Sequence, residues 1–135
     1  MIARAFATRR FGAYTIQAAI AAVHGEAASS ASTDWTQIVG LYDVLLRIDP
    51  SPVAALNRAA AVAMRDGAGA GLTLVEELLA QGALDGYSLA HAARAELCRR
   101  VGRIDAARAS YADALRLARQ EPERRFLAGR IRALE

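Results

Sequence analysis

The residues that could carry out catalysis or hold a metal ion are few in this sequence and lie far apart. The two histidines, His24 and His91, fall in different predicted helix pairs and show no metal-ligand spacing. The one cysteine, Cys98, cannot form an internal disulfide, which fits a reducing compartment. Its apolar neighbours predict a small, buried core side chain with an inert thiol. We therefore expect no metal site and no cofactor.

Two low-complexity stretches also lack the context that catalysis needs. The serine-rich segment 28–33, A-S-S-A-S-T, contains no serine nucleophile motif. The glycine-rich segment 66–71, D-G-A-G-A-G, follows a predicted helix and not a strand, so it is not a dinucleotide-binding loop. The sequence therefore favours a protein that is not an enzyme.

The clearest structural element is the stretch 34–50, D-W-T-Q-I-V-G-L-Y-D-V-L-L-R-I-D-P, which predicts one helix. Asp34 is a favourable N-cap residue, and Pro50 prevents the helix from continuing. A single helix of this length is marginal in water, so its apolar stripe requires partner helices. The side chains of that stripe recur at three- and four-residue spacing: Trp35, Ile38, Val39, Tyr42, Leu45 and Leu46.

Helical patterns cover most of the remaining chain, and strand patterns are absent. Gly82 is expected to end one helix, and the glycine-rich segment 66–71 is expected to lead into the next. The pattern predicts an all-α single domain over residues 1–135, with three antiparallel helix pairs and a C-terminal capping helix. The further helices are expected at residues 14–27, 53–65, 72–80, 87–101, 104–120 and 122–135, and residues 2–10 are expected to be the end of a preceding helix or a linker.

The regular alternation of helices indicates a repeat with a period near that of tetratricopeptide (TPR) units. The segment 14–50 fits such a unit, with Tyr42 at the aromatic position and Asp49-Pro50 at its end, whereas the middle pair fits less well. This pattern predicts a TPR-like right-handed superhelix, in which short side chains let paired helices pack closely. The third pair carries the characteristic small, glycine and aromatic positions at Ala95, Gly102, Ala107, Tyr111 and Ala114.

The net positive charge of the chain lies toward its C-terminus. Residues 1–93 contain six arginines and eight acidic residues, whereas residues 94–135 contain eleven arginines and six acidic residues. This basic region lacks aromatic platforms and groove-reading motifs, so we expect no direct DNA contact. No stretch approaches the roughly 20 apolar residues of a membrane span, and a cytoplasmic location without membrane contact is expected.

Four sequence strings resemble one particular protein family: G-A-Y-T-I-Q-A-A-I-A-A-V-H (12–24), T-D-W-T-Q-I-V-G-L-Y-D-V-L-L (33–46), P-S-P-V-A-A-L-N-R-A-A-A-V-A (50–63) and E-R-R-F-L (123–127). They resemble the C-terminal TPR-like extension of bacterial extracytoplasmic-function (ECF) RNA polymerase sigma factors. The resemblance implies that promoter- and polymerase-binding domains precede this segment in a longer protein. Ala13 stands where the family usually has proline, and Gly129 replaces a larger residue.

Two groups of residues are candidates for partner binding. Asn57 and Arg58 either line a concave peptide-binding surface or form a structural hydrogen bond between helices. Arg124, Arg125 and Phe126 form either a docking surface for sigma domains or polymerase, or a solvated face that caps the array. Within that terminal helix, Phe126, Leu127, Ile131 and Leu134 are expected on the apolar side, and Arg130 is expected to snorkel or to pair with an acid such as Glu123.

The expected function is that of a non-catalytic interaction and regulatory domain of an ECF-type sigma factor. Its partners would be the sigma domains, the RNA polymerase core or both, and its contacts would modulate transcription initiation. Two other functions remain open: a free-standing TPR adaptor that binds peptides, and a sensor domain for a small ligand. The aromatic pair Trp35 and Tyr42 is expected to pack in the core. The sequence specifies neither the regulatory signal nor the oligomeric state.

Overall fold

The structure is a computed structural model that describes residues 15–23 and 33–135. These residues form helices and connecting turns without a strand, which confirms the prediction of an all-α fold. The predicted helix end at residues 2–10, residues 28–32 of the serine-rich segment and His24 lie outside the described residues. A first helix covers residues 15–23, and it is followed by α2 (Trp35–Ile48), α3 (Pro52–Asp66), α4 (Ala68–Ala80), α5 (Ser88–Arg100), α6 (Ile104–Leu117) and α7 (Glu121–Ala133).

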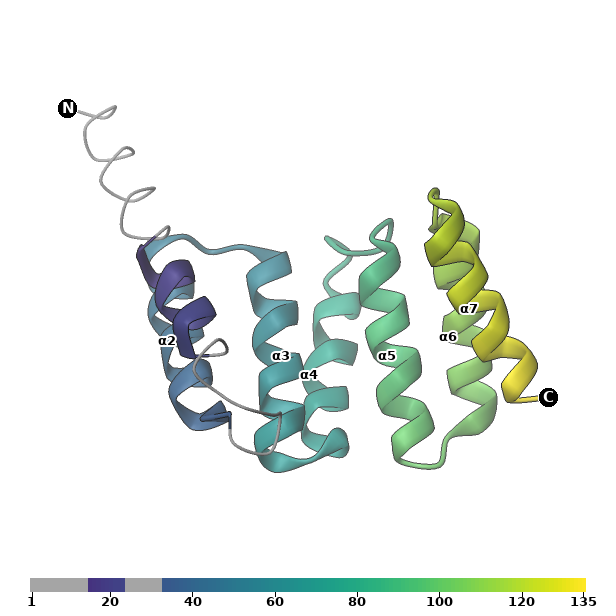
Figure 1. Cartoon of the computed structure of the whole chain (residues 1–135), viewed down its shortest axis with the longest axis horizontal. Helices are drawn as coiled ribbons and strands as arrows, with labels where there is room; N and C mark the ends of the chain where they lie inside the picture. Colours follow the sequence, from purple (N-terminus) through teal and green to yellow (C-terminus); the bar gives the residue numbers. More distant parts are fainter. Residues whose placement is uncertain (1–14, 24–32) are drawn as a thin grey trace.

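Figure 1 shows α2, α3, α4 and α5 following one another along the molecule, with the first helix drawn in front of α2 and α7 in front of α6, and successive helices run in alternating directions. Each helix from α2 to α6 packs on the next helix in the chain, and α3 also touches α5. The helix at 15–23 packs on α2 and α3 through Ile20, which is buried against Ile38 and Val62. The described chain therefore consists of consecutive helical hairpins.

Local capping residues set several helix boundaries. The Asp34 carboxylate accepts a hydrogen bond of 3.0 Å from the backbone N–H of Gln37, as predicted for the start of α2. At the start of α3, the Ser51 hydroxyl accepts a 3.3 Å hydrogen bond from the N–H of Ala54, and Pro52 occupies the first turn. Gly82 adopts a positive φ of 88° after α4, which confirms its predicted role at a helix end.

The prediction for the glycine-rich segment 66–71 was wrong. Helix α4 begins at Ala68, and only Gly67, with a φ of 107°, makes the turn from α3. A Cβ atom on Gly71 would lie 2.4 Å from the Cβ of Ala63, so this glycine lets α4 approach α3 closely. The glycines inside α4 lower its intrinsic helix propensity, but tertiary packing against α3 outweighs that cost.

The core is built from short side chains with a few large ones between them. Ala95, Ala107 and Ala114 have no exposed surface, and Tyr111 is 1% exposed. Cys98 is also fully buried, which confirms the prediction of a small core side chain. Small residues at helix contacts allow neighbouring axes to approach, and Tyr111 then fills the space toward α7 beside Leu127.

None of the helices in the described part of the chain is long and apolar enough to span a bilayer.

Candidate functional site

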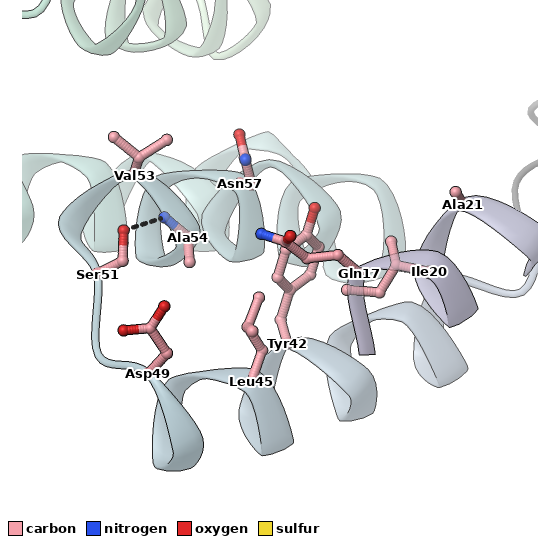
Figure 2. A pocket seen from close by; sticks show the side chains of 10 residues that line it. All are labelled: Gln17, Ile20, Ala21, Tyr42, Leu45, Asp49, Ser51, Val53, Ala54 and Asn57. Carbon is pink, nitrogen blue, oxygen red and sulfur yellow. Dashed lines mark hydrogen bonds between the residues drawn. The ribbon is translucent and has the colours of Figure 1, made fainter. Parts of the chain in front are cut away.

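A cleft of about 330 Å³ opens where the helix at 15–23 meets α2 and α3 (Figure 2). Apolar side chains from all three helices form much of its wall, and polar groups lie around its opening. The described residues that line this cleft are Gln17, Ile20, Ala21, Tyr42, Leu45, Asp49, Ser51, Val53, Ala54 and Asn57.

The short connection between α2 and α3 fixes one end of the cleft. Helix α2 stops at Ile48, and the backbone N–H of Asp49 still donates to the Leu45 carbonyl. The chain then turns through Pro50, and Ser51 caps α3. Pro50 and Pro52 each have a restricted φ, so this connection holds Asp49 and Ser51 at the edge of the cleft. Figure 2 shows the Asp49 carboxylate beside Ser51 at this end.

Tyr42 and Asn57 lie at the other end, near Gln17 (Figure 2). The ring of Tyr42 is half-buried, and this burial raises the pKa of its phenol above the ordinary value. Asn57 is exposed on α3. Phenol and amide groups can both donate and accept hydrogen bonds, so this end of the cleft can hold a ligand that carries either kind of group.

A second hollow of about 230 Å³ continues along α3 from the cleft. It shares Tyr42 and Asn57 with the cleft and is otherwise lined mainly by apolar side chains, including Trp35 and the exposed Met64. The two hollows therefore form one surface that follows α3. Trp35 and Tyr42, which were expected to pack in the core, do contact the buried cluster around Ile38, but both remain half-buried and also line this surface.

The cleft is suited to binding by hydrogen bonds and apolar contact. The Ser51 hydroxyl already accepts the capping hydrogen bond of α3. His91, on another hairpin, lies 2.8 Å from the backbone carbonyl of Asp85 through its Nε2 atom. Within residues 15–23 and 33–135, no group of three or more His, Cys, Asp or Glu side chains could hold a metal ion.

The predicted pair Asn57 and Arg58 does not form one site. Adjacent residues on a helix point about 100° apart. Asn57 faces the cleft. The Nε of Arg58 instead donates a 2.6 Å hydrogen bond to the Asp43 carboxylate of α2. The Arg58 side chain lines a different hollow, between α2, α3 and α4. Arg58 thus makes a structural hydrogen bond between helices, which is the second of the two roles considered for this pair.

The second predicted group, on α7, is also divided by the structure. Arg124 points toward α6, where it donates hydrogen bonds of 2.8 and 2.9 Å to the carbonyls of Leu115 and Ala118. Arg125 is exposed, and its Nε lies 3.7 Å from the Glu121 carboxylate. Arg124 therefore caps α6, while Arg125 remains on the surface.

Phe126 is 58% exposed, so the prediction that it lies on the apolar side of α7 was wrong. Leu127 takes the buried position, and the neighbouring residue must then point about 100° away. The Phe126 ring packs beneath the Arg130 guanidinium, 5.3 Å from its centre. Arg130 pairs at 3.9 Å with Glu96 of α5 and not with Glu123.

Most residues of the cleft could not be identified from the sequence. Gln17, Ser51 and Val53 carried no functional signal, and Asp49 was interpreted only as the end of a repeat. The available signal was the run from Asp49 to Pro52, in which two polar residues alternate with two prolines between helices. Such a run predicts a rigid connection, but it does not show which earlier helix faces it.

Similarity to a known protein extends over most of the chain. The chain is 43% identical over 127 residues to an uncharacterized protein of Rhizobium meliloti (strain 1021). The similarity covers 94% of this chain but only 30% of the length of that relative. No protein-family model and no solved structure matches the chain.

Proposed function

We propose that this chain is a TPR-like, non-catalytic interaction domain of an ECF-type RNA polymerase sigma factor. In this proposal three antiparallel helix pairs form a right-handed superhelix, and α7 caps it. The domain contacts the sigma domains, the polymerase core or both in the cytoplasm and thereby modulates transcription initiation, without touching DNA directly. Its action requires only that contact favours one state of the initiation complex over another.

The observation that carries this proposal is the position of the family-like strings in the structure. The strings at 33–46 and 50–63 lie on α2 and α3, and together they supply most of the cleft lining, from Tyr42 to Asn57. The string at 12–24 covers the helix at 15–23, which supplies Gln17, Ile20 and Ala21, and Asp49 lies between the other two strings. The residues that resemble the sigma-factor extension thus meet around one binding surface.

The packing of the third hairpin supports the repeat interpretation. Its predicted small positions, Ala95, Ala107 and Ala114, are fully buried, and Gly102 makes the turn between α5 and α6 with a φ of 86°. Tyr111 fills the predicted aromatic position between this hairpin and α7. These are the packing roles that a TPR unit gives to such residues.

The length of the Rhizobium meliloti relative is consistent with a domain attached to other regions. The segment similar to this chain makes up 30% of that protein. A sigma factor with a C-terminal extension has this kind of organisation.

Isothermal titration calorimetry tests the proposal directly. The 135-residue chain is titrated separately with the RNA polymerase core and with the promoter-binding region of the corresponding sigma factor. We expect saturable heat with at least one of them, and no heat at about 100 μM would contradict the proposal. Serum albumin at the same concentration controls for non-specific association.

A second candidate function is a small-ligand sensor, favoured by the volume of the cleft. About 330 Å³ is at the lower end of the range of small-molecule sites, roughly 300–1,000 Å³. A small ligand that raises the melting temperature of the isolated chain, with no binding to polymerase or sigma domains in its presence or absence, would favour this function.

A further inference from the structure

The cleft contains a carboxylate that lacks a partner among the described residues. The side chain of Asp49 takes part in no ion pair or hydrogen bond within residues 15–23 and 33–135. Most other acids of the described chain are engaged, as Asp43 is with Arg58 and Glu76 with Arg94. Asp49 is exposed, and no side chain of the described residues competes with a ligand for its carboxylate.

The lining around Asp49 favours a positively charged group. Asp49 is the only charged residue among the described residues that line the cleft, so no basic side chain there competes for it. The cleft lining also includes the apolar side chains of Leu45, Val53 and Ala54. A cationic head on an aliphatic stem matches both features, because such a side chain packs its stem on apolar groups and directs its charge to the carboxylate.

Among cationic groups, the arrangement favours a guanidinium. The Asp49 carboxylate and the Ser51 hydroxyl lie side by side as acceptors (Figure 2). A guanidinium presents several N–H donors in one plane and can engage a carboxylate and a neighbouring oxygen together. At the far end, the amides of Gln17 and Asn57 can pair with the backbone of the residues that flank an arginine.

We propose that the cleft binds an arginine side chain on a protruding segment of the partner protein. The guanidinium pairs with Asp49, the aliphatic stem lies on Leu45, Val53 and Ala54, and the flanking backbone reaches Asn57 and Gln17. This inference rests on the proposed function, since it specifies how that domain recognises its partner.

The test uses nuclear magnetic resonance titration of the ¹⁵N-labelled 135-residue chain. The probe is acetyl-Ala-Arg-Ala-amide, and its matched control replaces arginine with citrulline, which has nearly the same shape but no charge. We expect saturable shifts of the Gln17 and Asn57 side-chain amides with the arginine peptide and binding about tenfold weaker with citrulline. Equal binding of both peptides would overturn the proposal without any variant being made.

Variants provide the second arm of the test. Asp49→Asn should reduce affinity for the arginine peptide about tenfold and remove the preference over citrulline, whereas Asp85→Asn, at an exposed loop carboxylate outside the cleft, should change neither. Thermal unfolding confirms that both variants are folded. Unchanged arginine binding by folded Asp49→Asn would also overturn the proposal.

Calorimetry with polymerase and sigma domains separates this inference from the proposed function. If Asp49→Asn binds the macromolecular partner as tightly as the unsubstituted chain does, arginine recognition by the cleft is refuted while the proposed function stands. A second outcome is that neither the unsubstituted chain nor Asp49→Asn binds the macromolecular partner, while the arginine peptide still binds the unsubstituted chain more tightly than it binds Asp49→Asn. In that case the proposed function fails and the arginine site is retained.

Discussion

The hydroxyl of Tyr111 on α6 donates a 2.8 Å hydrogen bond to the carboxylate of Glu96 on α5. Glu96 also accepts hydrogen bonds from Arg99 and Arg100, and it lies 3.9 Å from Arg130 of α7. This one carboxylate therefore links three consecutive helices. Because Tyr111 is 1% exposed, its hydroxyl has little access to water as an alternative partner.

Replacing this hydroxyl should destabilise the C-terminal half of the chain. We expect Tyr111→Phe to lower the free energy of unfolding by about 1–2 kcal/mol, since a hydrogen bond to a charged group is lost while the ring still packs. Urea denaturation followed by circular dichroism measures the change. Tyr87→Phe is the control, because Tyr87 is half-buried and makes no side-chain hydrogen bond within the described chain. A loss equal to that of Tyr87→Phe would contradict this role for Tyr111.

The hydrogen bonds and ion pairs of Glu96 make the stability of the fold depend on pH. The pKa of Glu96 is lowered to about 2, first by its hydrogen bonds with Arg99 and further by those with Tyr111 and Arg100. In the unfolded chain this carboxyl has its ordinary pKa of 4.5. The folded pKa is the lower one, so the stabilisation is fully present above about pH 4.5 and is lost as the pH falls toward 2.

Glu96→Gln should remove this pH dependence. Between about pH 5 and pH 2, we expect the unsubstituted chain to lose about 1–2 kcal/mol more stability than the variant, a value reduced from the full linkage effect because solvent screens the pair. Urea denaturation at a series of pH values measures the difference. Glu77→Gln, at an exposed carboxylate of α4, should follow the unsubstituted chain. Parallel curves for Glu96→Gln and the unsubstituted chain would show that Glu96 is not the titrating group.

The two glycines inside α4 should respond in opposite ways to alanine. Gly71→Ala places a Cβ 2.4 Å from the Ala63 Cβ and 3.0 Å from the Ala59 carbonyl oxygen, so we expect a loss of about 1–3 kcal/mol. A Cβ on Gly69 meets no atom within 4 Å, and Gly69→Ala should stabilise the chain by about 0.5–1 kcal/mol through helix propensity. Thermal unfolding of both variants measures the contrast, and stabilisation by both would mean that α3 and α4 are not in close contact.

Local signals explain which parts of this fold could be predicted. The start of α2 at Trp35 depends on the Asp34 cap, and its end depends on Pro50, so both follow from neighbouring residues. The buried alanines and Tyr111 follow from a fixed spacing. The start of α4 does not, because the glycines there are compatible with a helix only through contact with Ala63 on another helix.

The candidate site depended on relations between distant residues, and these left little trace in the sequence. Gln17 and Asp49 border one cleft only because the first helix packs on α2 and α3, opposite the α2–α3 connection. Arg130 pairs with Glu96 of α5, although Glu123 lies on its own helix, because Glu123 instead lies 2.8 Å from the Ser88 hydroxyl. A helical pattern identifies the exposed face of one helix, but it does not identify the helix that covers another face.

The single thiol should report on global unfolding. Cys98 has no exposed surface, so we expect Ellman's reagent to modify it at least about 100-fold more slowly in the native chain than in urea. The matched control is the double variant Cys98→Ala with Ala112→Cys, which moves the thiol to an exposed position on α6. That thiol should react rapidly under native conditions. Rapid native modification of Cys98 itself would show that α5 opens locally.

Substitutions at inward and at exposed positions of α7 should show whether this helix binds a partner or only caps the helical array. Arg124→Ala removes two hydrogen bonds to carbonyls at the end of α6, so we expect a loss of about 1–2 kcal/mol of stability. Arg125→Ala changes only an exposed side chain and should leave stability within about 0.5 kcal/mol of the unsubstituted chain. Phe126→Ala should lower stability only slightly more than Arg125→Ala does, because the ring is 58% exposed and its stacking on Arg130 is weak at the surface.

If α7 docks on the sigma domains or polymerase, the two stable variants should bind that partner about tenfold more weakly in calorimetry, because an exposed arginine and aromatic ring are frequent anchors of interfaces. Removal of residues 122–135 from the full-length protein should then abolish transcription while the remaining helices stay folded. Unchanged partner affinity of Arg125→Ala and Phe126→Ala, together with unfolding of the truncated protein, would leave α7 as a cap. The inward hydrogen bonds of Arg124 and the burial of Leu127 would be sufficient for that role.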